Sequence, residues 1–136
     1  MIFLDTNVVS EVMRPHPAPV VLSWLAHQDS ELALSAVAIA EISFGIERIR
    51  PAERAARLSR SFGDIRQHYS TRIFPFDETA ALIYGAIMGE ASRQGRPLSP
   101  PDAMIAAIAL RHNAAMATRN TAHFRIEGLR IVNPWE

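Results

Sequence analysis

Three acidic residues, far apart along the chain, each stand alone in a long uncharged segment. They are Asp5 in residues 1–10, Glu41 in residues 32–46 and Asp102 in residues 97–110. None of them has an arginine three or four residues away. A buried carboxylate without a partner costs several kcal/mol, so it either binds a proton or lies beside a cation. Carboxylate oxygens suit Mg²⁺ or Mn²⁺. We therefore predict that the three acids converge around one such ion.

Asp5 directly follows the apolar run Ile2–Leu4, which is long enough for a short buried strand. Thr6 and Asn7 come next, and both residue types favour a turn or a helix cap. An acid at the carboxyl end of such a strand lies where open α/β sheets bind ligands. The local alternative is that Asp5 only caps the turn into a helix that starts at Val8.

The other two acids are predicted to lie on helices. Glu41 falls on the apolar face of a helix over residues 36–48, where a purely structural glutamate is unusual. Asp102 lies three residues after Ser99, at the start of another helix. There Ser99 and Asp102 can also form a capping box, which would need no ion.

Short apolar stretches alternate with helical stretches along the whole chain. The predicted strands are residues 2–4, 32–35, 72–75, 115–118 and 129–132. The predicted helices are residues 8–13, 19–27, 36–48, 51–69, 77–93 and 99–112, with Ser35, Asp77 and Ser99 as N-caps. This alternation indicates an α/β fold with a parallel sheet of four to five short strands, covered by helices on both faces.

The length and the amino-acid composition of the chain exclude several classes of protein and of site. A length of 136 residues predicts one domain over residues 1–136. The absence of cysteine excludes a disulfide scaffold and a thiolate metal site. All 14 basic residues are arginine, so no mechanism that needs a catalytic lysine operates here. The net charge of zero does not indicate a globally basic nucleic-acid binder. We expect no signal peptide, no transmembrane helix and a cytoplasmic location.

Several motifs in order resemble the PIN domain family, and more closely its VapC/FitB-type toxins of type II toxin–antitoxin pairs. The motifs are Leu4-Asp5-Thr6-Asn7, Ala40-Glu41-Ile42 with Gly45, Asp102 with Ile105-Ala106-Ala107, Ala117-Thr118-Arg119-Asn120 with Phe124, Gly128, and the ending Asn133-Pro134-Trp135. The resemblance covers essentially the whole chain. It implies a single PIN-like domain with a three-layer α/β/α fold.

The resemblance also implies an acidic, Mg²⁺- or Mn²⁺-dependent ribonuclease, a small antitoxin partner and homodimerisation. In this interpretation Asp5, Glu41 and Asp102 bind the metal ion, which activates water for attack on an RNA phosphodiester. Glu41 or Asp102 then accepts the proton of that water. Thr6, Asn7 and Thr118 orient the carboxylates or water.

One part of the family pattern is missing. Family members often carry a fourth acid just after the final Thr-Arg pair, or three residues later, and here those positions hold Asn120 and His123. Asn120 can still bind a metal-bound water or ligate through its amide oxygen, whereas His123 is expected at the surface. The loss of one negative charge weakens any second metal site. It also motivates an alternative, a catalytically weak or inactive binding module that acts through its partner.

Two other classes of protein also have an acidic site at the end of a parallel sheet. A phosphotransfer receiver needs a lysine, and a haloacid-dehalogenase-like phosphatase needs a second aspartate where Asn7 stands, so the sequence disfavours both.

Arginines outnumber acids between residues 47 and 66. These arginines can contact phosphates or can form a solvated helix face. They are Arg48, Arg50, Arg54, Arg57, Arg60 and Arg66.

Overall fold

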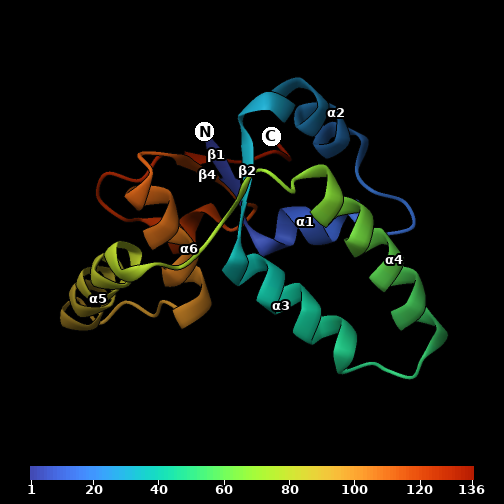
Figure 1. Cartoon of the computed structure of the whole chain (residues 1–136). Coiled ribbons are helices and arrows are strands. Elements are labelled where there is room, and N and C mark those ends of the chain that lie inside the picture. Colours follow the sequence, from blue (N-terminus) through green and yellow to red (C-terminus); the bar gives the residue numbers. More distant parts are fainter.

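The computed structural model describes residues 1–136 and has a five-stranded, all-parallel sheet in the order β3-β2-β1-β4-β5 (Figure 1). The strands are β1 (Ile2–Leu4), β2 (Leu32–Ser35), β3 (Ile73–Phe74), β4 (Ala115–Ala117) and β5 (Ile131–Val132). The predicted parallel sheet is therefore confirmed. The edge strands β3 and β5 are shorter than the sequence predicts, since each of them pairs on one side only.

Six helices connect and cover the strands. They are α1 (Thr6–Val12), α2 (Pro19–Gln28), α3 (Ala36–Glu47), α4 (Glu53–His68), α5 (Glu78–Arg93) and α6 (Pro100–Arg111). The sequence did not predict the two short 3₁₀ helices, η1 (Asp29–Glu31) and η2 (Thr121–Phe124). The predicted N-caps at Ser35, Asp77 and Ser99 each accept a hydrogen bond from a first-turn backbone N–H, at 2.8–3.3 Å. None of the helices combines the length and the apolar character needed to span a membrane.

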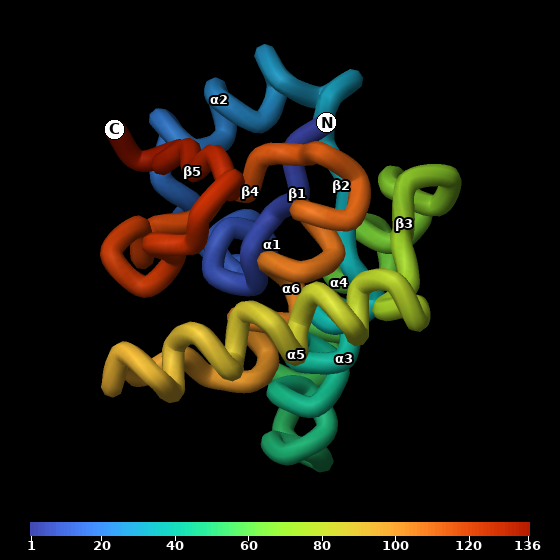
Figure 2. The backbone as a smooth tube through the Cα atoms, turned by 90° about the vertical axis from the view of Figure 1, so that its left-hand side faces the viewer, coloured from blue at the N-terminus to red at the C-terminus, as the bar shows by residue number.

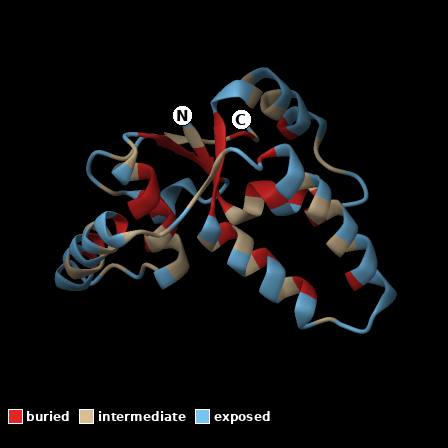
Figure 3. Cartoon of the chain, viewed as in Figure 1, coloured by how far each residue is buried: buried red, intermediate tan, exposed pale blue.

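Successive side chains of each strand point to opposite faces of the sheet and build two separate cores. Phe3, Ala33 and Met116 pack with the apolar faces of α5 and α6. Leu4 and Leu34, one residue away from Phe3 and Ala33, pack with helices α1, α2 and α4. Figure 1 and the turned view of Figure 2 show these helices on the two sides of the sheet. Burial is highest along the strands between them (Figure 3), so the fold is the expected three-layer α/β/α arrangement.

The order of the strands places a switch point between β1 and β4. From β1 the chain builds outward through β2 to β3, and it then returns to the other side of β1 to add β4 and β5. In open α/β sheets, the crevice at the carboxyl ends of the strands at such a point is the usual ligand site. Leu4 and Ala117 are paired at these ends, so Asp5 and Thr118 lie next to each other.

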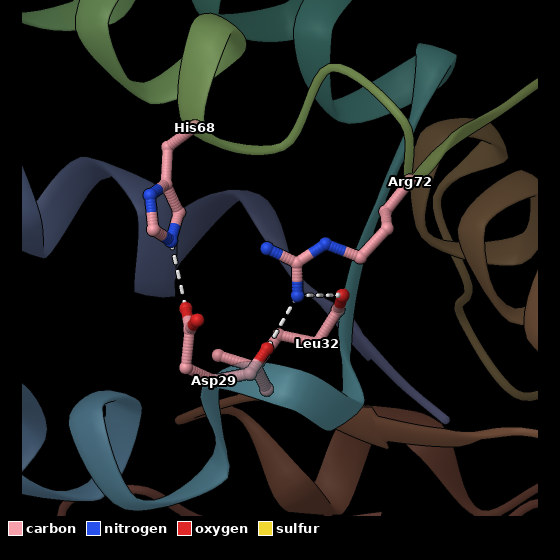
Figure 4. Close-up of polar contacts among 4 residues, drawn as sticks. All are labelled: Asp29, Leu32, His68 and Arg72. Carbon is pink, nitrogen blue, oxygen red and sulfur yellow. Dashed lines mark hydrogen bonds and ion pairs between the residues drawn. The ribbon is translucent and has the colours of Figure 1, made fainter.

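A polar cluster far from this switch point ties α4 to the start of β2 (Figure 4). The Arg72 guanidinium donates to the carbonyl oxygen of Leu32 at 3.2 Å and to that of Asp29, and it lies over the Tyr69 ring. The Nε2 atom of His68 lies 2.7 Å from Oδ1 of Asp29. This hydrogen bond holds the pKa of Asp29 below its ordinary value. The cluster fixes the return of the chain from α4 into β3.

Candidate active site

A cavity of about 790 Å³ lies beside the carboxyl end of β1. Asp5, Glu41 and Asp102 all line it, although the first and the last are 97 positions apart in the chain. Asp5 follows β1, Glu41 lies in the middle of α3, and Asp102 lies in the first turn of α6. The fold therefore gathers the three solitary acids around one cavity. Thr6, Asn7 and Asn120 also line it, whereas His123 does not.

Asp5 is held in a fixed orientation by its neighbours. Its side chain is only 4% exposed. Oδ1 accepts a hydrogen bond from the backbone N–H of Thr6 at 2.8 Å, and Oδ2 accepts one from the Thr118 hydroxyl at 2.7 Å. Asp5 thus caps α1, as the local alternative expected, and at the same time its carboxylate lines the cavity.

The Thr118 hydroxyl is the centre of a small hydrogen-bond network. It donates to Asp5 and accepts from the Asn7 side-chain amide at 3.3 Å and from the Asn120 backbone N–H at 3.1 Å. Thr118 is fully buried, so these three contacts use the hydroxyl's one proton and two lone pairs. The side-chain oxygen of Asn7 accepts from the Arg119 backbone N–H at 3.4 Å. Two of the residues predicted to orient the carboxylates, Asn7 and Thr118, therefore contact each other.

Glu41 is tied to Asp5 through a single residue. The Thr6 hydroxyl donates to Oε1 of Glu41 at 2.6 Å, while the Thr6 backbone N–H donates to Asp5. Glu41 and Asp102 are both half-buried, and neither forms an ion pair. The backbone N–H of Asp102 donates to Ser99, so half of the predicted capping box is present, and the Asp102 side chain makes no hydrogen bond within the chain.

Burial raises the pKa of Asp5 from its ordinary value of 3.8 to about 6. The hydrogen bonds from Thr118 and Thr6 oppose this change, and the negative charges of Asp102 and Glu41 add to it. No arginine contributes, so the site has a surplus of negative charge around a buried carboxylate. A divalent cation would relieve this repulsion.

The donor chemistry of the three acids suits a hard cation such as Mg²⁺ or Mn²⁺. All three line the cavity, but no three His, Asp or Glu side chains are close enough together to ligate an ion directly. Mg²⁺ commonly keeps several waters when one or two carboxylates bind it. The residues therefore fit an ion that is held partly through water.

Glu11 is a fourth acid of the cavity that the sequence did not single out. It is 5% exposed, and its oxygens accept from the Arg14 guanidinium at 3.1 Å and from the Ala18 backbone N–H at 2.9 Å. The hydrogen bond from Ala18 is the main reason why the pKa of Glu11 lies below its ordinary value. The helical spacing of Asn7, Ser10, Glu11 and Arg14 was the available signal.

The sequence profile of the PIN domain family matches residues 2–129. The chain belongs to the PIN domain family. Its relatives in this family include VapC ribonuclease Y4jK of Sinorhizobium fredii, which is 38% identical and aligned over 100% of this chain and 99% of its own. Toxin FitB of Neisseria gonorrhoeae is 37% identical over 99% of both chains. The crystal structure of FitAcB from Neisseria gonorrhoeae superposes with a TM-score of 0.90 at 36% identity, covering 100% of this chain and 99% of that one.

In this PIN domain, the Thr118→Val substitution is expected to lower the free energy of unfolding by about 1–3 kcal/mol. The reason is that the buried Asp5 carboxylate loses a donor, and the Asn7 amide and the Asn120 backbone N–H lose their acceptor. The lost hydrogen bond to Asp5 should also raise the pKa of that carboxyl further. Urea denaturation at neutral pH measures the first effect, with the exposed Thr121→Val as control. Equal losses in both variants would contradict the proposed network.

Truncation of Glu11 is expected to destabilise the protein as well. Glu11→Ala leaves the Ala18 backbone N–H without its acceptor and removes the partner of Arg14, at a cost of about 1–3 kcal/mol. Because the pKa of Glu11 is lowered, its contribution is present above the ordinary value of 4.5 and is lost as the pH falls. Denaturation at two pH values, with the exposed Glu127→Ala as reference, measures it. A loss that does not shrink on acidification contradicts this role.

Proposed function

We propose that this protein is a Mg²⁺- or Mn²⁺-dependent endoribonuclease that acts as the toxin of a toxin–antitoxin pair. The observation that carries the proposal is the buried Asp5 carboxylate at the β1/β4 switch point, which shares one cavity with Glu41 and Asp102. Family membership supports it. A further relative, 32% identical over 93% of this chain and 92% of its own, is the tRNA(fMet)-specific endonuclease VapC of Shigella flexneri.

The chain's own residues account for positioning and proton transfer. A metal ion bound by Asp5, Glu41 and Asp102 would supply an activated water and offset charge on the phosphate. Thr118 and Thr6 hold Asp5 in place by hydrogen bonds, and Thr6 also holds Glu41. Oε2 of Glu41 and both carboxylate oxygens of Asp102 accept no hydrogen bond within the chain, so either side chain can accept the proton of the attacking water.

The proposed partners are an RNA substrate, an antitoxin protein and a second copy of the chain. The relative Toxin FitB and the structure described as FitAB bound to a DNA fragment, at a TM-score of 0.89 and 36% identity, support a partner protein. A second candidate function is a binding module with little catalysis. It is motivated by the cavity position of Asn120, where a carboxylate would have completed the acidic set.

The test separates the two functions. Purified, antitoxin-free protein is incubated with bulk bacterial tRNA in EDTA, and then with Mg²⁺ or Mn²⁺ in excess. Cleavage that requires the added ion, and that is lost in Asp5→Asn protein prepared in parallel, supports the nuclease. Cleavage of equal rate in EDTA contradicts it. Tight binding of a co-expressed partner without cleavage in any sample favours the binding module.

A further inference from the structure

Three of the six arginines in residues 48–66 line the same cavity as the acids. They are Arg48, Arg54 and Arg57. The other three do not line it. Arg50 is paired with Glu47 at 3.0 Å, and Arg66 lies over the Phe62 ring, 4.8 Å from its centroid. The structure thus separates arginines that the sequence left as one group.

The acids and these arginines lie at different places along the cavity. Glu41, Gly45 and Arg48 follow each other on one face of α3 and its C-cap, and all three line the cavity. Seven residues of helix rise by about 10 Å. Figure 1 shows the segment that joins α3 to α4 away from the sheet. Arg48 is the C-cap of α3, and Arg54 and Arg57 lie in the first turns of α4 next to this segment, whereas Asp5 directly follows β1.

Arg54 and Arg57 have no partner within the chain. Neither of them forms an ion pair or a hydrogen bond, and both are exposed. Arg14, the other arginine of the cavity, is bound to Glu11 at 3.1 Å. Two adjacent guanidinium groups without a carboxylate partner provide several donors for a phosphate.

The surface between the two groups is open. Gly45 lies between Glu41 and Arg48 on α3, and a Cβ atom placed there would meet no atom within 4 Å. The apolar side chains of Ile42 and Leu58 complete this part of the lining. At this position of α3, the path from the acids to the arginines is therefore free of a side chain.

We infer that Arg54 and Arg57, assisted by Arg48, form a phosphate subsite that binds RNA at a phosphate next to the one that is cleaved. The inference rests on the proposed function. Its physical reason is charge: Asp5, Glu41 and Asp102 repel an incoming RNA strand, and the arginines attract its neighbouring phosphate. The arginines thereby set the position of the strand relative to the acids.

The first test measures binding in the absence of cleavage. In an Asp5→Asn background, the affinity for a short, fluorescein-labelled single-stranded RNA of mixed sequence is measured over a range of salt concentrations. Arg54→Ala/Arg57→Ala should raise the Kd roughly tenfold at low salt. It should also reduce the slope of log K against log salt by about 1.4, which is about 0.7 for each lost phosphate contact. The Lys double variant should recover most of the slope.

The matched control removes the same charge elsewhere. Arg60 and Arg130 are exposed, lie outside the cavity and form no ion pair. The Arg60→Ala/Arg130→Ala protein should bind RNA much as the parent does. If the two double variants weaken binding equally, the subsite is disproved and only a general charge effect remains.

The second test uses the active protein and bulk bacterial tRNA. Arg54→Ala/Arg57→Ala should raise KM about as much as it raises the Kd, with kcat nearly unchanged, because the arginines do not touch the reacting phosphate. Gly45→Leu should give the same pattern by filling the open path. If the wild-type protein is active and both variants have the same KM as the wild type, the subsite is disproved and the nuclease proposal stands. RNA binding that depends on Arg54 and Arg57, without cleavage in any sample, supports the subsite and removes the nuclease.

Discussion

RNA cleavage by the Asp5→Asn variant is expected to be at least about 100-fold slower than cleavage by the wild-type protein. A loss of this size is typical when a fixed group that acts on developing charge is removed. Asn keeps the shape of Asp5 and can still accept the hydrogen bond from the Thr6 backbone N–H. It lacks the negative charge that the proposed metal ion needs. The fold should persist while the activity is lost.

The measurement is the initial rate of tRNA cleavage in Mg²⁺ or Mn²⁺, with protein of matched purity. Glu127→Gln is the control, because Glu127 is exposed, lies outside the cavity and forms no ion pair. Circular dichroism reports whether the Asn variant is folded. A folded Asp5→Asn protein that cleaves at the wild-type rate would remove Asp5 from the mechanism.

As the pH rises from 4 to 8 in EDTA, the free energy of unfolding of the wild-type protein should fall relative to that of the Asp5→Asn variant. The folded-state pKa of Asp5, about 6, lies above its ordinary value of 3.8, so the folded protein holds this proton more tightly than the unfolded chain. The resulting stability is complete below the ordinary value and is lost as the pH rises through about 6. The difference between the two pKa values sets an upper limit of roughly 3 kcal/mol.

Urea denaturation of both proteins across this pH range measures the effect. Glu11, Asp29 and Asp77 have lowered pKa values and therefore act in the opposite direction, but they are common to both proteins and cancel in the difference. Excess Mg²⁺ should restore stability to the wild-type protein at pH 8 and should affect the Asn variant much less. A difference in stability that is constant from pH 4 to pH 8 would contradict the raised pKa.

Most of the fold could be predicted because its signals are local. Ser35, Asp77 and Ser99 mark helix starts by their own side chains, and each accepts the capping hydrogen bond in the structure. The runs 2–4 and 32–34 are apolar throughout, as strands buried on both faces require. The edge strands were predicted too long and the two 3₁₀ helices were not predicted, since their limits depend on pairing and packing rather than on residue type.

The acids of the site could also be selected locally, because an isolated carboxylate in an apolar segment is unusual. Local sequence does not identify the hydrogen-bond partners of these acids, and the roles of Thr6 and Thr118 came from the family resemblance. The helical spacing of Glu11 from Asn7 is a signal for its place at the cavity, but nothing near Glu11 indicates that its carboxylate binds the Ala18 backbone N–H at the start of α2. Likewise, Arg54 and Arg60 are arginines of the same helix. Only the packing of α4 against α3 places Arg54, and not Arg60, at the cavity.

The sequence by itself determined that three solitary carboxylates needed a common explanation, and where along the elements each would lie. The tertiary structure decided how close they come and what holds them. Thr118 donates to Asp5 across 113 positions of chain because β4 pairs with β1. Residue periodicity describes the faces of a single helix or strand. The order of strands follows from burying all of these faces at once, so the contacts between distant segments appear only in the folded chain.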